Sequence, residues 1–451
     1  MRSHRRPDGL RKALFLAALC LLGPFHLAVA GICHPEAVPA ATLLLPYFEV
    51  DLNDPNGLTT LFSINNAAAA AALTNVTIWT DLAVPVATFN VYLTGYDVQT
   101  INLRDVLIFG NLPQTASLGQ DPNDRISPKG IYSQDIDIPS CQGTLPPPPL
   151  PGSFVSHLQN ALTGRPSPVL QGLCAAQFLG DNIARGYITV DTVRGCAARN
   201  PADPGYFASG TAAGDATDQN ALWGSWYIVN AAQGYAQGSD MVAVEADGSN
   251  PATSTPGNYT FYGRYVGWSA RDHREPLATT FAAQYANGGA FSAGTSYLVW
   301  RDSKVAQAPF DCPVQFNVRP LWYPLHQEGL VIFDEQETPS VVGVCPFSAS
   351  PQPSATPSEC PPGFKIAPFP AATQRIAVGG ASFPVPFSFG WNFLDLNVTV
   401  AADPNVPPAD RHAAQAWVVA TQSSHAHFAV AVDAYRLDSA CSPNHSTPDH
   451  P

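Results

Sequence analysis

Short stretches with the composition of β-strands recur along most of this chain and constrain its fold more than any other feature. They are rich in Thr, Val, Ile and aromatic residues and are separated by turn formers such as Asp54-Pro55-Asn56-Gly57. In one of them Val76 and Ile78 alternate with Thr77 and Trp79, which predicts a strand with different surroundings on its two faces. The strands expected on this basis are 58–65, 73–82, 86–93, 98–103, 186–193, 222–230, 240–246, 259–266, 295–301, 314–319, 329–334, 374–378, 391–400, 416–421 and 428–437.

These strands predict a mainly β protein of two antiparallel, immunoglobulin-like β-sandwich domains, tied by disulfides and with few short helices. Residues 31–310 form the first expected sandwich, which carries a Cys- and Pro-rich excursion at about 113–214. Residues 311–441 form the second, and 442–451 form a polar, flexible tail. The first four strands suggest an antiparallel meander in which Ala67–Ala72 is a flexible hairpin connection, because this alanine run is too short and uncapped to be a helix.

Two helices are expected between the strands. Ser153 can cap the first, in which Phe154, Leu158 and Leu162 repeat at four-residue spacing before Gly164. The second begins near Pro276 and ends at Gly288-Gly289, with an apolar stripe of Leu277, Phe281 and Tyr285.

The amino terminus has the pattern of a removable export signal. Residues 1–12 contain five cations, Ala13–Leu22 is almost wholly apolar, and Ala28-Val29-Ala30 offers the small residues that a signal peptidase recognises. Cleavage after Ala30 is expected; a retained anchor and a twin-arginine route through Arg5-Arg6 are the alternatives. Because no later segment reaches the length of a membrane-spanning helix, the mature chain is predicted to be exported without a membrane span, to a secreted, periplasmic or cell-surface location.

Cysteine usage supports export. Of nine cysteines, Cys20 lies in the signal, and the remaining eight form an even set, as expected for disulfides in an oxidising compartment. Proximity in sequence favours Cys312 with Cys345 and Cys360 with Cys441. The lack of a Cys-x-x-Cys motif argues against a zinc knuckle or a thioredoxin-like site. The predicted disulfide residues are Cys33, Cys141, Cys174, Cys196, Cys312, Cys345, Cys360 and Cys441.

The mature chain is acidic and sparsely charged. Without the first 30 residues it has 17 Lys and Arg against 34 Asp and Glu, a balance of −17, and it has no polybasic cluster. Such a surface repels nucleic acid, anionic lipid and acidic polysaccharide. It leaves divalent cations, neutral carbohydrate and protein as partners; the sequence does not predict an oligomeric state.

Four segments carry a resemblance: LLLPYFEVDLNDPNGLTTLFSINN (Leu43–Asn66), VYLTGYDVQTINLRDV (Val91–Val106), YLVWRDSK (Tyr297–Lys304) and LVIFDEQE (Leu330–Glu337). Through them the chain resembles a group of exported bacterial proteins to which no activity is attached. The resemblance implies export from a bacterium, and no catalytic residue can be carried over from it.

Two places could hold a metal ion. His425 and His427 are two residues apart and would point the same way on a strand, with His412 or Asp433 as a third ligand; solvated hairpin histidines are the alternative. Asp334, Glu335 and Glu337 follow an apolar strand and could bind calcium, the one cofactor that the sequence leaves open, or could form an acidic strand end. The loop at Asp51 lacks the full calcium-loop pattern and is interpreted as a turn.

Other groups could serve catalysis or binding. Asp135 and Asp137 would share one strand face, as an acid–base pair in glycoside cleavage requires, or would be solvated edge residues. Arg271–Glu275 is expected to cap a helix and form surface ion pairs. Trp322-Tyr323 is the aromatic pair expected in a loop, where it could contact carbohydrate, whereas most of the eight tryptophans, Trp223 and Trp226 among them, lie in apolar strand runs and are expected in the core.

No nucleophile, zinc-protease or phosphate-loop motif occurs in the sequence. We therefore expect a non-catalytic secreted or cell-surface binding or structural protein. A secreted or periplasmic hydrolase that uses paired carboxylates and a calcium-stabilised, adhesin-like protein are the alternatives.

Overall fold

A computed structural model describes residues 38–121, 125–209, 212–250, 253, 260–262, 270–301, 308–312, 329–342, 344–345, 365–366, 371–380, 383, 385–396, 415–424 and 428–437. These residues confirm the mainly β fold, since antiparallel sheets dominate them and only two α-helices occur among them. The immunoglobulin-like topology stays a prediction. The expected signal and the tail lie outside the described residues, as do Cys33, Cys360 and Cys441.

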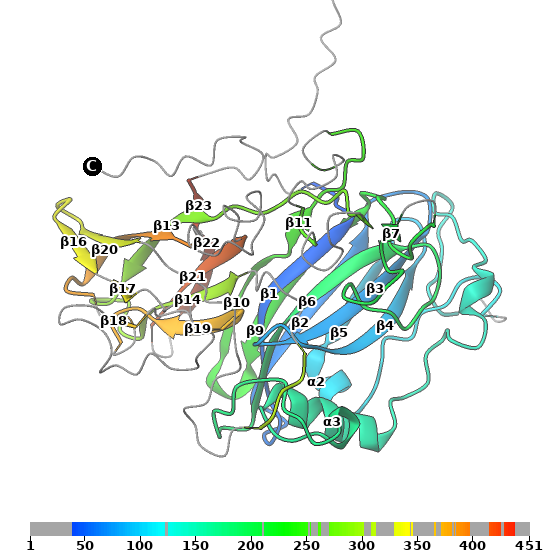
Figure 1. The fold of residues 1–451 in the computed structure, drawn as a ribbon, viewed down its shortest axis with the longest axis horizontal. Helices are drawn as coiled ribbons and strands as arrows, with labels where there is room; N and C mark the ends of the chain where they lie inside the picture. The colour runs from blue at the N-terminus through cyan, green and yellow to red at the C-terminus, as the bar shows by residue number, and fades with distance from the viewer. Residues whose placement is uncertain are drawn as a thin grey trace, which may run out of the picture. The chain divides into compact units, whose positions relative to one another are not determined.

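Two five-stranded sheets come from residues 42–244 (Figure 1). One sheet has the order β11-β1-β6-β3-β4. The other has the order β10-β9-β2-β5, and its fifth strand, β8, also pairs with β2. The strands of the first are β1 (Thr42–Asp51), β3 (Ala72–Thr80), β4 (Pro85–Leu93), β6 (Ile183–Val193) and β11 (Val242–Val244). Those of the second are β2 (Leu58–Asn66), β5 (Val98–Asn102), β8 (Leu222–Trp223), β9 (Ser225–Asn230) and β10 (Tyr235–Asp240).

Two further sheets use strands from the second half of the chain. Their orders are β16-β15-β20-β13-β23 and β19-β14-β21-β22, and two small pairs, β12 with β7 and β17 with β18, complete the described strands. The bounds are β7 (Ala208–Ser209), β12 (Ala270–Arg271), β13 (Thr280–Ala286), β14 (Gly294–Arg301), β15 (Gly329–Asp334), β16 (Pro339–Val342), β17 (Val344–Cys345), β18 (Lys365–Ile366), β19 (Thr373–Ala377), β20 (Phe389–Asp395), β21 (Ala416–Ser424), β22 (Phe428–Asp433) and β23 (Tyr435–Arg436). Because β13 and β14 pair with strands from beyond residue 328, sheet pairing does not follow the expected division at residue 310.

The first pair of sheets encloses the larger core. Leu43 and Leu45 of β1, Val76 and Ile78 of β3 and Trp226 of β9 all belong to one buried cluster. The opposite face of β3 is covered as well, because Trp79 is fully buried there, where it stacks on Tyr187 of the neighbouring strand with ring centroids 5.6 Å apart. Ala67–Ala71 joins β2 to β3, which lie in different sheets, so the predicted hairpin and meander are wrong at this point: the alanine run connects sheets and not paired strands.

Two helices are described: α2 (Leu103–Leu107) and α3 (Gly152–Leu162). The prediction of a helix at α3 is confirmed, although Pro151 occupies the N-cap position and Ser153 lies inside the helix. Its buried face contains Leu158, Ala161 and Leu162.

The helix expected from Pro276 is wrong, because β13 occupies this place and pairs with β20 and β23. Phe281 and Tyr285 are four residues apart, and this spacing puts two side chains on one face of a strand as well as of a helix. Both side chains lie in the core cluster of the second pair of sheets. The sequence pattern of this segment fits a helix or a strand, and pairing with neighbouring strands determines that it is a strand.

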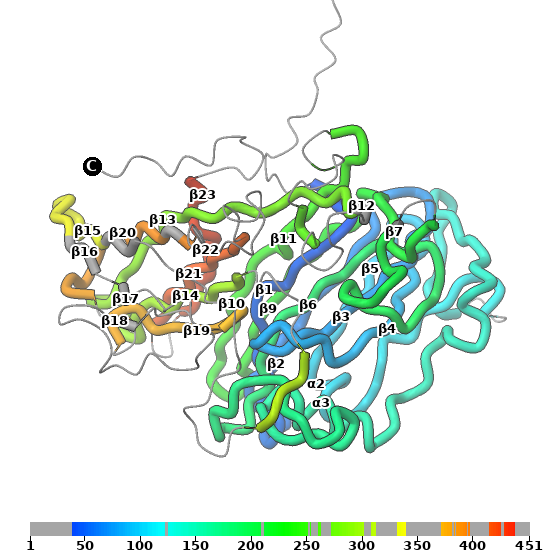
Figure 2. Tube along the Cα trace, viewed as in Figure 1, coloured from blue at the N-terminus to red at the C-terminus, as the bar shows by residue number. Residues whose placement is uncertain are grey.

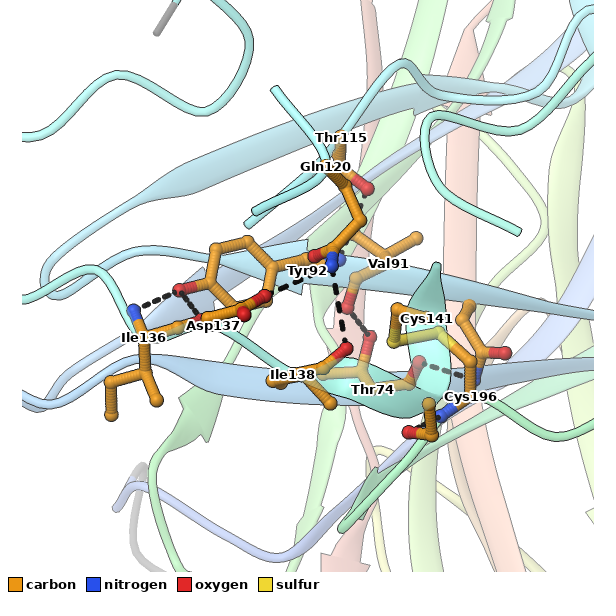
Figure 3. Close-up of a disulfide and its surroundings, with 12 residues drawn as sticks. Thr74, Val91, Tyr92, Thr115, Gln120, Ile136, Asp137, Ile138, Cys141 and Cys196 are labelled. Carbon is orange, nitrogen blue, oxygen red and sulfur yellow. Dashed lines mark hydrogen bonds between the residues drawn. A yellow bond between two sulfur atoms is a disulfide. The ribbon is translucent and has the colours of Figure 1, made fainter. Parts of the chain in front are cut away.

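The excursion after β5 runs beside β4 and is fastened to it (Figure 2). Its anchors are Thr115, which accepts a hydrogen bond from the backbone N–H of Tyr92, and Asp135, which accepts one from the Tyr92 hydroxyl at 2.7 Å. A disulfide between Cys141 and Cys196 closes the same region (Figure 3).

A second disulfide joins Cys174 to Cys312, so the predicted Cys312–Cys345 pairing is wrong. Sequence proximity is a poor guide here because the fold brings residues 138 positions apart into contact, with backbone hydrogen bonds between Cys174 and Phe310. For these four cysteines the prediction of disulfide bonding is confirmed.

Candidate ligand-binding face

The outward side of the sheet around β2 has the clearest features of a binding site. On one side β8 and β9, which flank Gly224, pair with β2 at the same offset, which places Trp223 opposite Asn65 and Tyr227 opposite Leu61. On the other side β5 places Val98 opposite the same Asn65. These four strands thus place their side chains in regular cross-strand rows.

Strand alternation sends neighbouring aromatic residues to opposite sides of this sheet. Trp226, Ile228, Phe62 and Ile64 lie in the core. In contrast, Trp223 is 50% exposed and Tyr227 is 49% exposed. We call the outward side around Trp223, Tyr227, Val98, Asn65 and the serines between them the Trp223 face.

Polar, uncharged groups lie between the two aromatic residues. Ser63 and Ser225 are cross-strand neighbours whose hydroxyl oxygens are 3.3 Å apart, and the Asn65 side-chain amide donates to Ser63 at 3.1 Å. Asn65 is only 2% exposed, and its amide oxygen has no hydrogen-bond partner. If the amide were flipped, so that its oxygen and nitrogen exchanged positions, the nitrogen would be the atom without a partner. An unmet buried group of this kind costs roughly 1–3 kcal/mol.

A glycine allows Tyr227 to lie close to the sheet. Gly238 of β10 is directly opposite Tyr227, and a Cβ atom there would come within 2.7 Å of the Tyr227 ring and 1.9 Å of the Trp226 carbonyl oxygen. No other residue type fits at this position without displacing the ring or the strand. The backbone thus helps to hold Tyr227 in its half-exposed position.

The face contains no positive charge. The sequences of β2, β5, β8, β9 and β10 include no Lys, Arg or His, and their one acidic residue is Asp240, opposite Ser225. Because an anionic ligand would find no cation on these strands and would meet a carboxylate, the electrostatics of the face favour an uncharged ligand.

Two ionic clusters elsewhere are buried within the protein. Arg274, whose side chain is 1% exposed, lies 3.5 Å from Asp191 and 3.3 Å from Asp272, and the Tyr206 hydroxyl donates to Asp191 at 2.6 Å. Burial raises the pKa of Asp191 and Asp272, and the charge of Arg274 opposes this rise. The prediction that 271–275 caps a helix is therefore wrong, because no helix follows in the described residues and Arg274 is buried. The expected surface ion pair occurs at His273, which lies 2.6 Å from the exposed Asp218.

The second cluster joins β1 to β19. The Glu49 carboxylate accepts a hydrogen bond from Arg375 at 3.0 Å and one from the Tyr47 hydroxyl at 2.6 Å. Near it, Asp81 accepts hydrogen bonds from the backbone and side chain of Gln177, while burial raises the pKa of Asp81 to about 7. The backbone oxygen of Asp81 accepts from Ala372 and Thr373, so this carboxyl group lies where the two halves of the chain meet.

Of the metal and carbohydrate sites predicted from sequence, only the acidic group at Asp334 lies within the described residues. His425, His427, His412, Trp322 and Tyr323 lie outside the described residues. Asp334 accepts hydrogen bonds from the backbone of Gln336 and Thr338 and so closes the β15–β16 turn, while Glu335 and Glu337 are exposed. Among the described residues no group of three His, Cys, Asp or Glu side chains is arranged to hold a metal ion.

Asp135 and Asp137 do not share a strand face, since their segment has no strand structure. Asp135 is held by the Tyr92 hydroxyl and by Lys129 at 3.7 Å. Asp137 accepts a hydrogen bond from Gln120 at 3.0 Å (Figure 3). Asp135 therefore fastens the excursion to β4, and Asp137 joins two segments within the excursion.

Trp223 and Asn65 are the residues that sequence reasoning missed. A signal was available, because Trp223 and Trp226 are separated by three positions and a continuous strand must therefore direct them to opposite faces. One tryptophan of this pair had to point outward. Asn65, which lies in a separate strand, gives no comparable signal.

No helix in the described part of the chain combines the length and apolar character needed to cross a bilayer. Comparisons with protein-family models, with curated proteins and with solved structures found no match to this chain.

Proposed function

We propose that this chain is a non-catalytic, exported bacterial protein that binds a ligand on the Trp223 face. The observation that carries the proposal is the combination on one outward sheet face of two half-exposed aromatic side chains with a buried amide whose oxygen has no hydrogen-bond partner. Exposed aromatic residues next to unmet polar groups are typical of binding surfaces.

Export, to a secreted, periplasmic or cell-surface location, is part of the same proposal. Two observations support it: the amino-terminal segment has the composition of a cleavable signal, and all four described cysteines with placed side chains form disulfides. Disulfides of this kind persist in oxidising compartments.

The two alternative functions have less support from the described geometry. The paired carboxylates of the hydrolase hypothesis, Asp135 and Asp137, are bound by the protein's own side chains. The acidic group of the calcium hypothesis includes Asp334, which is occupied in a turn.

Oxidative footprinting tests the proposal without knowledge of the ligand. The purified protein is labelled with hydroxyl radicals in buffer and in an envelope and culture extract of the producing organism, and modification of each aromatic residue is read by mass spectrometry. We expect the extract to protect Trp223 and Tyr227 and to leave Tyr132, which is 80% exposed in the excursion, labelled as before. Equal labelling of all three residues in both conditions would contradict the proposal.

A further inference from the structure

We infer that the ligand of the Trp223 face is a neutral glycan chain that lies along β8 and β9. The inference rests on the proposed function and adds the chemical class of the ligand. It is drawn from the spacing of the aromatic residues, from the polar groups between them and from the charge of the face.

The spacing calls for an extended ligand. Trp223 and Tyr227 are four residues apart and pair with β2 at the same offset, and this separation corresponds to about 13 Å at the rise of an antiparallel strand. A single sugar ring is shorter than this separation. A linear oligosaccharide can place one ring over the indole and another over the phenol, with intervening sugars above Ser225 and Ser63.

The side chains of the Trp223 face match both the apolar C–H groups and the hydroxyl groups of a sugar. The C–H groups of a pyranose ring form an apolar patch that stacks on aromatic rings, and Trp and Tyr provide such rings with little conformational freedom to lose. The hydroxyl groups around the ring both donate and accept hydrogen bonds. Ser63, Ser225 and Asn65 offer partners of both kinds within the same row of the sheet.

Asn65 gives the strongest indication of a hydroxyl. Asn65 lies between the cross-strand neighbours Trp223 and Val98, both of which are at least half exposed. A ligand hydroxyl that reached this amide would supply the hydrogen bond that its oxygen lacks. A hydroxyl satisfies either the oxygen or the nitrogen, so the orientation of the amide does not change this conclusion.

Charge separates neutral from acidic glycans. The five strands of this sheet carry no cation, and Asp240 next to Ser225 repels carboxylates and sulfates. The same carboxylate can accept a hydrogen bond from a neutral sugar hydroxyl. A neutral chain is thus the class that these side chains fit.

Isothermal titration calorimetry tests the inference with defined probes: cellohexaose, xylohexaose, mannohexaose and maltohexaose, with glucose and hexagalacturonate as controls. We expect at least one neutral hexasaccharide to bind, with glucose and hexagalacturonate at least tenfold weaker. The Trp223→Ala and Tyr227→Ala variants should each weaken binding at least tenfold, while Tyr132→Ala, which removes an exposed tyrosine elsewhere, should bind as the unaltered protein does.

Asn65→Ala should also weaken binding; Asn65→Asp keeps the size of the side chain and separates loss of the amide from loss of packing. If no neutral hexasaccharide binds, or if binding is unchanged in Trp223→Ala, the inference is overturned. Protection of Trp223 by the extract together with failure of all four oligosaccharides would overturn the glycan inference alone and leave the proposed function intact.

Discussion

Trp223 and Asn65 face each other across β8 and β2, one half exposed and the other 2% exposed. The pair joins an apolar ring to a polar group with an unmet hydrogen bond, within a sheet whose opposite side is packed into the core. Residues far apart in the sequence make this arrangement: Ser63 and Ser225, the next pair in the register, are 162 positions apart.

Truncation of two tryptophans three positions apart should destabilise the protein to very different extents. Trp226 is fully buried, so Trp226→Ala should lower the free energy of unfolding by about 3–5 kcal/mol. Trp223→Ala removes a half-exposed side chain and should lower it by less than about 1 kcal/mol. Urea denaturation followed by circular dichroism measures both, and equal losses would show that the face assignment is wrong.

The two disulfide pairings can be tested directly by peptide mapping. Proteolysis of the non-reduced protein should yield linked peptides that contain Cys141 with Cys196 and Cys174 with Cys312. A linked Cys312–Cys345 peptide would contradict the fold. Replacement of Cys141 and Cys196 together by serine should destabilise the protein by roughly 2–5 kcal/mol.

Arg274 should tolerate little change. Arg274→Ala leaves Asp191 and Asp272 buried without the guanidinium and should lower the free energy of unfolding by about 3–5 kcal/mol. Arg274→Lys keeps the charge but not the forked geometry and should recover only part of this loss. Exposed Arg199, paired with Asp215 at 3.0 Å, serves as the matched control, and Arg199→Ala should have an effect of no more than about 1 kcal/mol.

Asp81 should make stability depend on pH. Burial raises its pKa from 3.8 to about 7, so between these values the native state holds a proton that the unfolded chain has released. The contribution of this group to stability is therefore fully present at low pH. As pH rises from 3.8 to about 7 the contribution falls by on the order of 1 kcal/mol per pH unit, and above pH 7 it no longer changes.

Unfolding free energies at pH 5 and pH 8 for the unaltered protein and for Asp81→Asn isolate this contribution. The variant lacks the titrating group. Between pH 5 and pH 8 its free energy of unfolding should therefore fall by less than that of the unaltered protein. Identical pH profiles for the two proteins would refute the assignment to Asp81.

Strands could be predicted from sequence where local pattern and tertiary environment agree. The prediction of 329–334 matches β15, because its apolar run is bounded by turn formers. At Phe281 and Tyr285 the pattern fits helix and strand equally, and pairing with β20, more than 100 positions away, decides between them.

The candidate site could not be predicted from the sequence, because it also depends on pairing between distant strands. Alternation could have shown that Trp223 points away from Trp226, but nothing local shows that Asn65 lies beside it. Side-chain neighbours across a sheet depend on register, and register is set by the whole fold. The same holds for Cys174 and Cys312, whose pairing depends on contacts between distant segments.

The central claim, that a ligand stacks on Trp223, is tested most directly by nuclear magnetic resonance. Protein labelled with nitrogen-15 in its tryptophans is titrated with the hexasaccharide that calorimetry identifies, and the indole signals of Trp223 and Trp226 are assigned by single substitution. The account predicts that the Trp223 signal shifts in a saturable manner while that of buried Trp226 moves far less. Saturable binding that leaves the Trp223 signal in place would contradict it.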